Sequence, residues 1–300
     1  MLGANDIFAG MSQERLDASI EIDHASSQEI VQIIQEQDRF VVEAVAAEAP
    51  RIAHAIDQIT DRLQHGGRLI YAGAGTSGRI AMLDASELPP TYGTDRDLVR
   101  VIMAGGERAF FDAAEGAEDD EDAAIAAVNA NVRPEDALVG IAASGTTPYT
   151  VAAVRRANMI GALTIAVTSN PDSPLAADAD IAIAPRTGAE VIMGSTRMKS
   201  GTAQKLILNA ISTGVMIRLG RIYSNLMIDM PATNEKLRSR AVHMVEIAAN
   251  VPRAEAVQAV RDADGNLRLA TVMARRKVSA DEARRILAEH DGDLREVLAK

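Results

Sequence analysis

The fold is decided by the stretch Arg68-Leu69-Ile70-Tyr71-Ala72-Gly73-Ala74-Gly75-Thr76-Ser77-Gly78-Arg79. Residues 68–72 form a short, mostly apolar run that leads directly into a glycine-rich turn, and a helical pattern follows the turn. A strand, a glycine-rich turn and a helix in this order are typical of the first unit of an α/β protein.

Apolar runs of the same kind recur along the middle of the chain. They are residues 98–104, 137–142, 162–167 and 180–184. Between them, residues 109–128 and 150–159 are the clearest stretches with a helical pattern. Near-continuous apolar strands alternating with helices indicate a parallel sheet that is covered on both faces. We therefore predict an α/β fold with a doubly wound, five-stranded parallel sheet, whose ligands bind at the carboxyl ends of the strands.

Helical segments flank the predicted sheet on both sides. Residues 26–65 carry apolar residues at helical spacing, interrupted by Pro50. Beyond Pro252, the pattern of residues 255–268 returns in residues 282–295 at a constant offset of 27 residues. Two copies of a helix–Gly–helix unit predict a small C-terminal bundle. We divide the chain into an N-terminal helical segment (1–50), a ligand-binding α/β domain (51–250) and a C-terminal helical bundle (251–300).

Composition excludes several classes of function. The chain has 31 basic and 42 acidic residues, so its net charge of −11 offers no basic field for a nucleic acid. It has no cysteine, which excludes disulfides and thiolate metal sites, and its 5 histidines show no metal-ligand spacing. The N-terminus does not have the pattern of a signal peptide, and no apolar run reaches the ~18 residues of a membrane span. We expect a cytoplasmic protein without a metal site and without nucleic-acid or membrane partners.

The glycine-rich turn formally matches GxGxxG, the fingerprint of dinucleotide binding. A dinucleotide site needs an acidic residue at the end of the second strand, but that strand ends in Ala104-Gly105-Gly106. The turn also contains two hydroxyl groups, which suit a single phosphate or a sugar. A turn that only packs tightly is the alternative. The candidate substrate-binding residues of this turn are Gly75, Thr76, Ser77 and Gly78.

A second loop at a strand end, Ser144-Gly145-Thr146-Thr147, also combines hydroxyl groups with a glycine, and a helix is expected to begin at Pro148. Such a loop can bind a phosphate through backbone amides and hydroxyls, although serine and threonine are also common as simple N-caps. Because both loops follow strands of one sheet, one anionic sugar could bridge them. Lys199 could help to neutralise the anion, and a solvated lysine at a helix start is the equal alternative.

Two glutamates are candidates for acid–base chemistry. Glu87 lies in a segment where we expect Pro89 and Pro90 to end a helix. Glu115 lies between small residues and Gly116, which would let a substrate approach closely. The alternative for both is a solvated side chain in an acid-rich region.

A resemblance to a known family rests on several blocks of the chain, taken in order. The blocks are residues 69–93, 113–119, 140–149, 194–209 and 232–237. Together they resemble the N-acetylmuramic acid 6-phosphate etherases, bacterial lyases of cell-wall recycling that are built on a sugar-isomerase (SIS) domain. The resemblance implies a SIS domain at 51–250, a ubiquitin-associated-like (UBA-like) C-terminal bundle, a homodimer and no metal or organic cofactor.

The same resemblance implies a reaction. The etherases cleave the D-lactyl ether at C3 of N-acetylmuramic acid 6-phosphate, which yields N-acetylglucosamine 6-phosphate and D-lactate. Carried over residue by residue, Glu87 is the expected proton donor and Glu115 the second catalytic acid or base. The expected partner is therefore a small sugar phosphate.

Two other functions fit the same loops. One is a non-catalytic sugar-phosphate sensor like the related glucokinase regulatory proteins, and the other is an aldose–ketose isomerase on the same fold. The presence of both Glu87 and Glu115 favours the lyase, because a sensor needs the phosphate loops but no pair of carboxylates.

Overall fold

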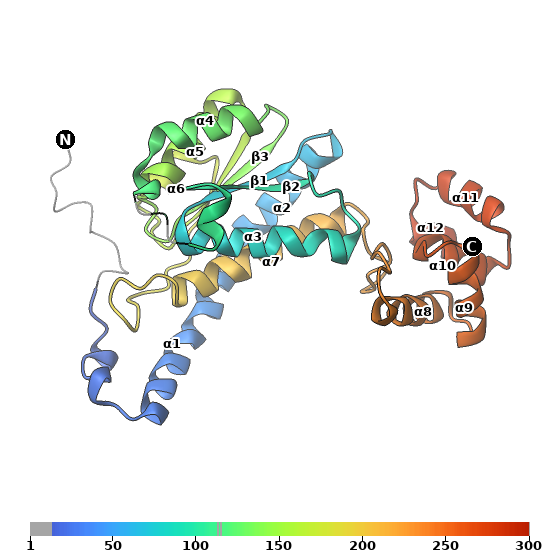
Figure 1. The fold of residues 1–300 in the computed structure, drawn as a ribbon, viewed down its shortest axis with the longest axis horizontal. Helices are drawn as coiled ribbons and strands as arrows, with labels where there is room; N and C mark the ends of the chain where they lie inside the picture. The colour runs from blue at the N-terminus through green and yellow to red at the C-terminus, as the bar shows by residue number, and fades with distance from the viewer. Residues whose placement is uncertain (1–13, 113, 115, 300) are drawn as a thin grey trace. The chain divides into compact units, whose positions relative to one another are not determined.

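The computed structural model describes residues 14–112, 114 and 116–299 (Figure 1). The described chain divides into two compact units. The first unit extends to Ala85 and continues over Asp97–Val215. The second unit comprises Ser86–Arg96 and the chain from Met216 onward.

The first unit contains a five-stranded parallel sheet with the strand order β2-β1-β3-β4-β5. The strands are β1 (Leu69–Gly73), β2 (Val99–Met103), β3 (Ala137–Ile141), β4 (Leu163–Val167) and β5 (Ile181–Ile183). Every residue of β1, β3 and β4 is buried, as expected for strands that helices cover on both faces. The prediction of a five-stranded parallel sheet is confirmed.

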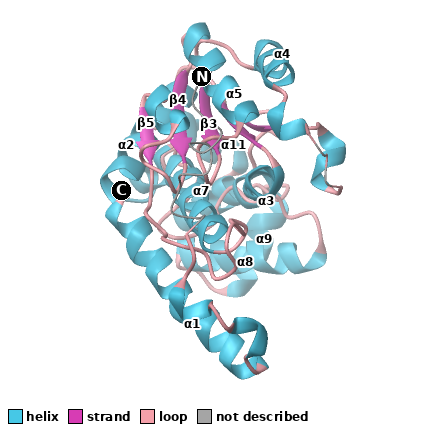
Figure 2. Cartoon of the chain, turned by 90° about the vertical axis from the view of Figure 1, so that its left-hand side faces the viewer, coloured by secondary structure: helices cyan, strands magenta, loops and turns pink. Residues whose placement is uncertain are grey.

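Helices cover both faces of this sheet (Figure 1 and Figure 2). On one face, Ile70 belongs to the same apolar cluster as Val128 of α4 and Val154 of α5. On the other face, the Tyr71 hydroxyl donates to the Asp84 carboxylate of α3 over 2.9 Å. The helices that lie wholly or mostly in this unit are α1 (Ser27–Ala47), α2 (Ala49–Gln64), α3 (Gly75–Tyr92), α4 (Glu121–Asn131), α5 (Pro148–Ile160), α6 (Pro174–Asp178) and α7 (Lys199–Arg218), with the short 3₁₀ helices η2 (Asp17–Ser19), η3 (Ile22–His24), η4 (Glu107–Phe110) and η5 (Ala117–Asp119). The sheet is doubly wound, as predicted.

The N-terminal helix α1 begins where the sequence predicts. The Ser26 hydroxyl accepts a hydrogen bond from the Glu29 amide over 3.4 Å, and the Glu29 carboxylate accepts one from the Ser26 amide over 2.7 Å. This reciprocal pair is a capping box, which satisfies two backbone donors at the helix start.

The prediction that Pro89 and Pro90 end a helix is wrong, because α3 continues through both prolines to Tyr92. Gly93 follows with a φ of 61° and donates to the Pro89 carbonyl over 3.0 Å. The prolines remove two backbone donors, but their fixed φ is compatible with a helix, and the loss falls in the last turn.

The prediction of one continuous helix over residues 109–128 is wrong in its first part. Among the described residues before Glu121, where α4 begins, only those of η4 and η5 are helical. Gly116 has a φ of 72°, a left-handed conformation that an α-helix does not contain. The Asp120 side chain then accepts a hydrogen bond from the Ala123 amide over 2.8 Å and caps the new helix.

The second unit is helical in its C-terminal part, as predicted. Its helices α8 (Glu235–Ala249), α9 (Arg253–Asp262), α10 (Leu267–Arg276), α11 (Ala280–Ala288) and α12 (Leu294–Ala299) enclose an apolar core of their own. The internal repeat is visible in the backbone, where Asp264 and Gly265 have φ values of 52° and 78° and Asp291 and Gly292 have φ values of 50° and 76°. Each copy is therefore a pair of helices joined by two consecutive left-handed residues.

Arg268 of the first repeat copy makes contacts that bind α10 to the rest of the second unit. Its guanidinium donates to both carboxylate oxygens of Asp229, over 2.9 and 2.8 Å. It also donates to the carbonyls of Gly292 over 2.5 Å and Gly220 over 2.7 Å. The equivalent residue of the second copy, Arg295, is exposed.

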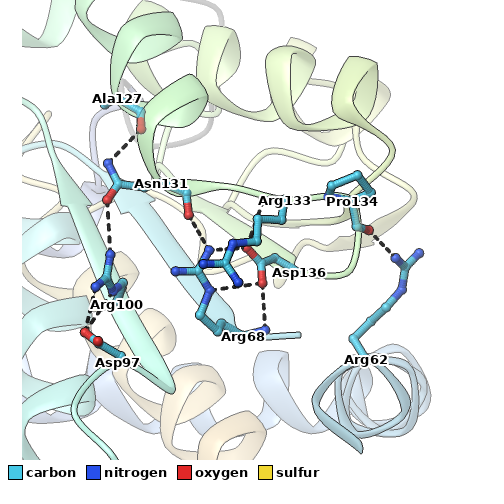
Figure 3. Close-up of polar contacts among 9 residues, drawn as sticks. All are labelled: Arg62, Arg68, Asp97, Arg100, Ala127, Asn131, Arg133, Pro134 and Asp136. Carbon is cyan, nitrogen blue, oxygen red and sulfur yellow. Dashed lines mark hydrogen bonds and ion pairs between the residues drawn. The ribbon is translucent and has the colours of Figure 1, made fainter. Parts of the chain in front are cut away.

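An ion pair fixes the amino ends of β1 and β3 (Figure 3). The Asp136 carboxylate is buried, with 1% of its side chain exposed, and accepts from the Arg68 guanidinium over 2.6 and 3.2 Å. It also accepts from the backbone amides of Arg68 over 2.8 Å and Arg133 over 2.9 Å. The hydrogen bond to Asp136 is the main cause that raises the pKa of Arg68. Because the carboxylate serves both strands, it sets their relative position where they enter the sheet.

A second buried carboxylate connects the sheet with two helices. Asp84 of α3 accepts from the Tyr71 hydroxyl of β1, from the Asn209 amide of α7 over 2.7 Å and from the Ser212 hydroxyl of α7 over 2.9 Å. Burial, followed by the nearby Asp84 charge, raises the pKa of Tyr71 well above its usual value, so the phenol remains a donor.

We expect Asp136→Ala to lower the free energy of unfolding by about 3–5 kcal/mol, because it leaves the Arg68 guanidinium without its charged partner. Urea denaturation followed by circular dichroism measures this loss. The matched control is Asp97→Ala, whose carboxylate pairs with Arg100 at the surface and is 69% exposed; it should cost about 1 kcal/mol or less. Equal losses in the two variants would contradict the role given to Asp136.

Candidate functional site

The two loops that the sequence singled out leave the sheet side by side. Strand β1 pairs with β3 in a register that places Gly73 opposite Ile141, and these are the last residues of the two strands. A Cβ atom at Gly73 would lie 3.1 Å from the Gly78 amide nitrogen and 3.2 Å from the Ile141 carbonyl. Glycine at this position therefore allows the first turn of α3 to fold back onto the strand ends.

The first loop ends in the N-terminus of α3, which begins at Gly75 with a φ of 53°. Thr76 is half-buried, and Ser77 and Gly78 are buried. A Cβ atom at Gly78 would lie 2.1 Å from the sulfur of Met103, the last residue of β2. The helix start thus lies tightly against two strand ends, and its unpaired backbone N–H groups give it the chemistry of an anion site.

The second loop is held in a compact shape by its own hydroxyls. The Ser144 hydroxyl accepts from the Thr146 amide over 3.2 Å and from the Thr146 hydroxyl over 3.0 Å. Gly145 has a φ of 68°, and a Cβ atom there would lie 2.1 Å from the Ser173 hydroxyl oxygen. Ser144, Thr146 and Thr147 remain partly exposed at the start of α5 and are accessible to a ligand.

A cavity of about 250 Å³ lies between the first loop and the segment that follows β2. Its lining residues are Ala74, Gly75, Arg79, Met103, Ala104, Ala109, Ala114, Gly116, Ala117 and Glu118. Of the predicted binding residues, only Gly75 is among them. Arg79 was not among the predicted site residues, although it is the last residue of the stretch that decided the fold.

The two candidate glutamates are placed differently. Glu115 lies outside the described residues, but its neighbours Ala114 and Gly116 both line the cavity. Glu87 is exposed on the C-terminal part of α3, in the portion of that helix that belongs to the second unit.

Lys199 is not the solvated lysine that the sequence left as an alternative, because only 2% of the residue is exposed. Its Nζ donates to the Gln37 side chain of α1 over 3.2 Å. The fully buried Glu190 carboxylate accepts from the backbone amides of Lys199 and Ser200, each over 3.0 Å, and caps α7. Burial lowers the pKa of Lys199, against the opposing charges of Glu190 and Asp38.

The start of α7 also lies against the first loop. A Cβ atom at Gly201 would lie 3.8 Å from a methyl carbon of Thr76. The candidate residue Lys199 is therefore the first residue of a helix that begins beside the glycine-rich turn. The partners of this lysine, Gln37 and Glu190, could not be inferred, because no local pattern connects them with it.

Two classes of feature are absent from residues 14–112, 114 and 116–299. No helix there combines the length and apolarity that a membrane span requires. No group of three or more acidic, histidine or cysteine side chains is arranged to hold a metal ion in that part of the chain.

Comparison with known proteins identifies the domain. Residues 51–158 match the glucokinase regulatory protein N-terminal SIS domain, and residues 114–213 match the SIS domain. The solved structure of the protein c3406 from E. coli CFT073 superposes with a TM-score of 0.50 at 17% identity, covering 67% of this chain and 97% of that one. At that identity the likeness concerns the fold alone.

Curated relatives match most of the chain. The N-acetylmuramic acid 6-phosphate etherase of Symbiobacterium thermophilum is 58% identical over 87% of this chain and 87% of its own length. The protein of the same name from Clostridium beijerinckii is 50% identical over 96% of this chain and 95% of its own length. The chain therefore belongs to the N-acetylmuramic acid 6-phosphate etherase family of carbon–oxygen lyases, built on the SIS fold.

Proposed function

We propose that this chain cleaves the D-lactyl ether of N-acetylmuramic acid 6-phosphate and releases N-acetylglucosamine 6-phosphate and D-lactate. The observation that carries the proposal is the 58% identity to an etherase over 87% of the chain. Two hydroxyl-rich loops at the ends of adjacent strands support it, because they suit the phosphate of a sugar phosphate.

The proposed chemistry is acid–base catalysis. An ether is a poor leaving group, but once the sugar ring opens, the aldehyde at C1 makes the C2 proton removable. A carboxylate base, Glu115, takes that proton, and a carboxylic acid, Glu87, protonates the departing lactate oxygen as the C3–O bond breaks. Water then adds to C3 of the resulting double bond, and a proton returns to C2. Each well-placed acid or base contributes about 10²–10⁴-fold to the rate.

Substrate binding is assigned to the two loops. We propose that the hydroxyls and amides of Ser77, Ser144, Thr146 and Thr147 hold the phosphate. Backbone N–H groups, or room for the substrate to approach the backbone closely, would come from Gly75, Thr76, Gly78 and Gly145. Lys199 would supply positive charge. Binding energy from the phosphate, remote from C2 and C3, would orient the reacting carbons.

We also propose that the enzyme is a cytoplasmic homodimer, with an N-terminal segment at 1–50, the SIS domain at 51–250 and a C-terminal bundle at 251–300. In α7, the side chains of Ile207, Leu208 and Ile211 are fully buried within the chain, so they are not available for contact with a second copy. Support for a second copy comes from α1, where Phe40 is 57% and Val42 61% exposed.

Incubation of the purified protein with N-acetylmuramic acid 6-phosphate should release equal amounts of D-lactate and N-acetylglucosamine 6-phosphate, measured by a lactate dehydrogenase assay and mass spectrometry. Binding of the sugar phosphate without turnover would indicate a sensor. Interconversion of aldose and ketose phosphates without lactate would indicate an isomerase.

We expect Glu115→Gln to abolish exchange of the C2 hydrogen with solvent deuterium, a loss of at least about 10²-fold, because the amide is no base. Glu87→Gln should slow lactate release by a similar factor while some C2 exchange persists. Proton NMR in D₂O follows both events. Glu121→Gln, an exposed carboxylate at the start of α4, is the control and should retain activity. Equal loss of exchange in both variants would reject this division of roles.

Substitution Gly145→Ala should raise the KM for the sugar phosphate about tenfold. A left-handed alanine costs roughly 1–2 kcal/mol, and the new Cβ would displace the loop from Ser173. The control is Gly161→Ala at the end of α5, where φ is 93° and the nearest atom is 4.0 Å away. It carries similar strain outside the loop, so an equal rise in KM would show that the effect is not local.

A further inference from the structure

Arg79 of α3 makes an unusual set of contacts with the segment that follows β2. Its Nη2 donates to the Ala109 carbonyl over 2.9 Å and to the Asp112 carbonyl over 3.2 Å, and its Nε donates to the Phe110 carbonyl over 3.2 Å. One guanidinium thus binds three backbone carbonyls of a segment whose described residues form no helix longer than a short 3₁₀ turn. The side chain is half-buried and lines the 250 Å³ cavity.

Close packing holds the same segment from a second side. Gly105, just after β2, has a φ of 81°. A Cβ atom there would lie 2.6 Å from the Cβ of Ala114, 3.2 Å from that of Ala109 and 3.3 Å from that of Ala117. The small side chains therefore pack directly onto the strand end, and Arg79 supplies the polar contacts that this packing lacks.

The chain held in this way leads directly into Glu115, which follows Asp112 by three positions in the sequence. We propose that Arg79 is a positioning residue of the reaction, which holds residues 109–112, the described segment that leads into the catalytic base. This inference rests on the proposed function. It gives Arg79 no contact with the reacting carbons, because its Nε and Nη2 donors are directed at the carbonyls.

The shape of the guanidinium explains why arginine is required. Its planar fork can reach carbonyls on both sides of Phe111 at once, whereas the ammonium of lysine is a compact point charge. A shift of about 1 Å in a catalytic group can cost roughly 10²-fold in rate. Loss of the fork should therefore change kcat and leave the phosphate loops unaffected.

The test uses the full chain with N-acetylmuramic acid 6-phosphate. We expect Arg79→Lys to lower kcat, and with it C2 exchange, by roughly 10- to 100-fold. KM should stay within about twofold of the parent value, because the contacts that bind the substrate before the reaction are unchanged. In Arg79→Ala, guanidinium ion at tens of millimolar should restore part of kcat, and methylammonium should not.

The control is Arg108→Lys in the same segment, whose side chain is 89% exposed and contacts only the Asp112 carboxylate at 3.5 Å among the described residues. It should leave kcat and KM unchanged.

If Arg79→Lys raises KM without lowering kcat, Arg79 contacts the substrate phosphate and the proposal is overturned. An unchanged kcat, or a loss that guanidinium does not restore, also overturns it. If the parent protein releases no lactate, the proposed function fails instead. If circular dichroism shows that Arg79→Ala does not fold, the proposal is decided by Arg79→Lys alone, by whether kcat falls while KM stays unchanged.

Discussion

In-register pairing of β1 with both of its neighbours is the constraint on which the candidate site depends. Gly73 lies opposite Met103 of β2 and opposite Ile141 of β3, so three strands end at one level. Parallel strands require crossover helices, which bring each following loop back to the same edge. The glycine-rich turn, the cavity-lining segment after β2 and the hydroxyl-rich loop all leave the sheet from this edge, although long stretches of sequence separate them.

Buried charged groups fix the strands of the sheet at positions where apolar packing alone would let them shift. The Arg68–Asp136 pair fixes the amino ends of β1 and β3, and Asp84 connects β1 with α3 and α7. Buried carboxylates are costly unless every oxygen is satisfied, and both of these accept several hydrogen bonds. The first pair thus holds the amino ends of two strands and Asp84 holds the middle of β1, and the functional loops extend from this scaffold.

The strands were predictable because their apolar runs are nearly continuous and each ends at a small or polar residue. The two loops were predictable as well, since glycine and hydroxyl residues after a strand carry their own local signal. The segment before α4 was not, because its helical composition is overridden by the left-handed Gly116 and by the distant guanidinium of Arg79. Nor was the burial of Lys199, whose partner Gln37 is 162 positions away. The path of α3 through Pro89 and Pro90 also contradicts the local rule.

The duplicated Asp-Gly turn in the second unit shows how two copies of one motif can diverge. Both copies retain the same pair of left-handed residues, yet Arg268 is committed to Asp229 while its counterpart Arg295 faces solvent. The two copies therefore share a backbone conformation, whereas the arginine that follows the turn has different surroundings in each. In the first copy the guanidinium of Arg268 binds other segments of the second unit, whereas in the second copy the same type of cation, Arg295, is exposed.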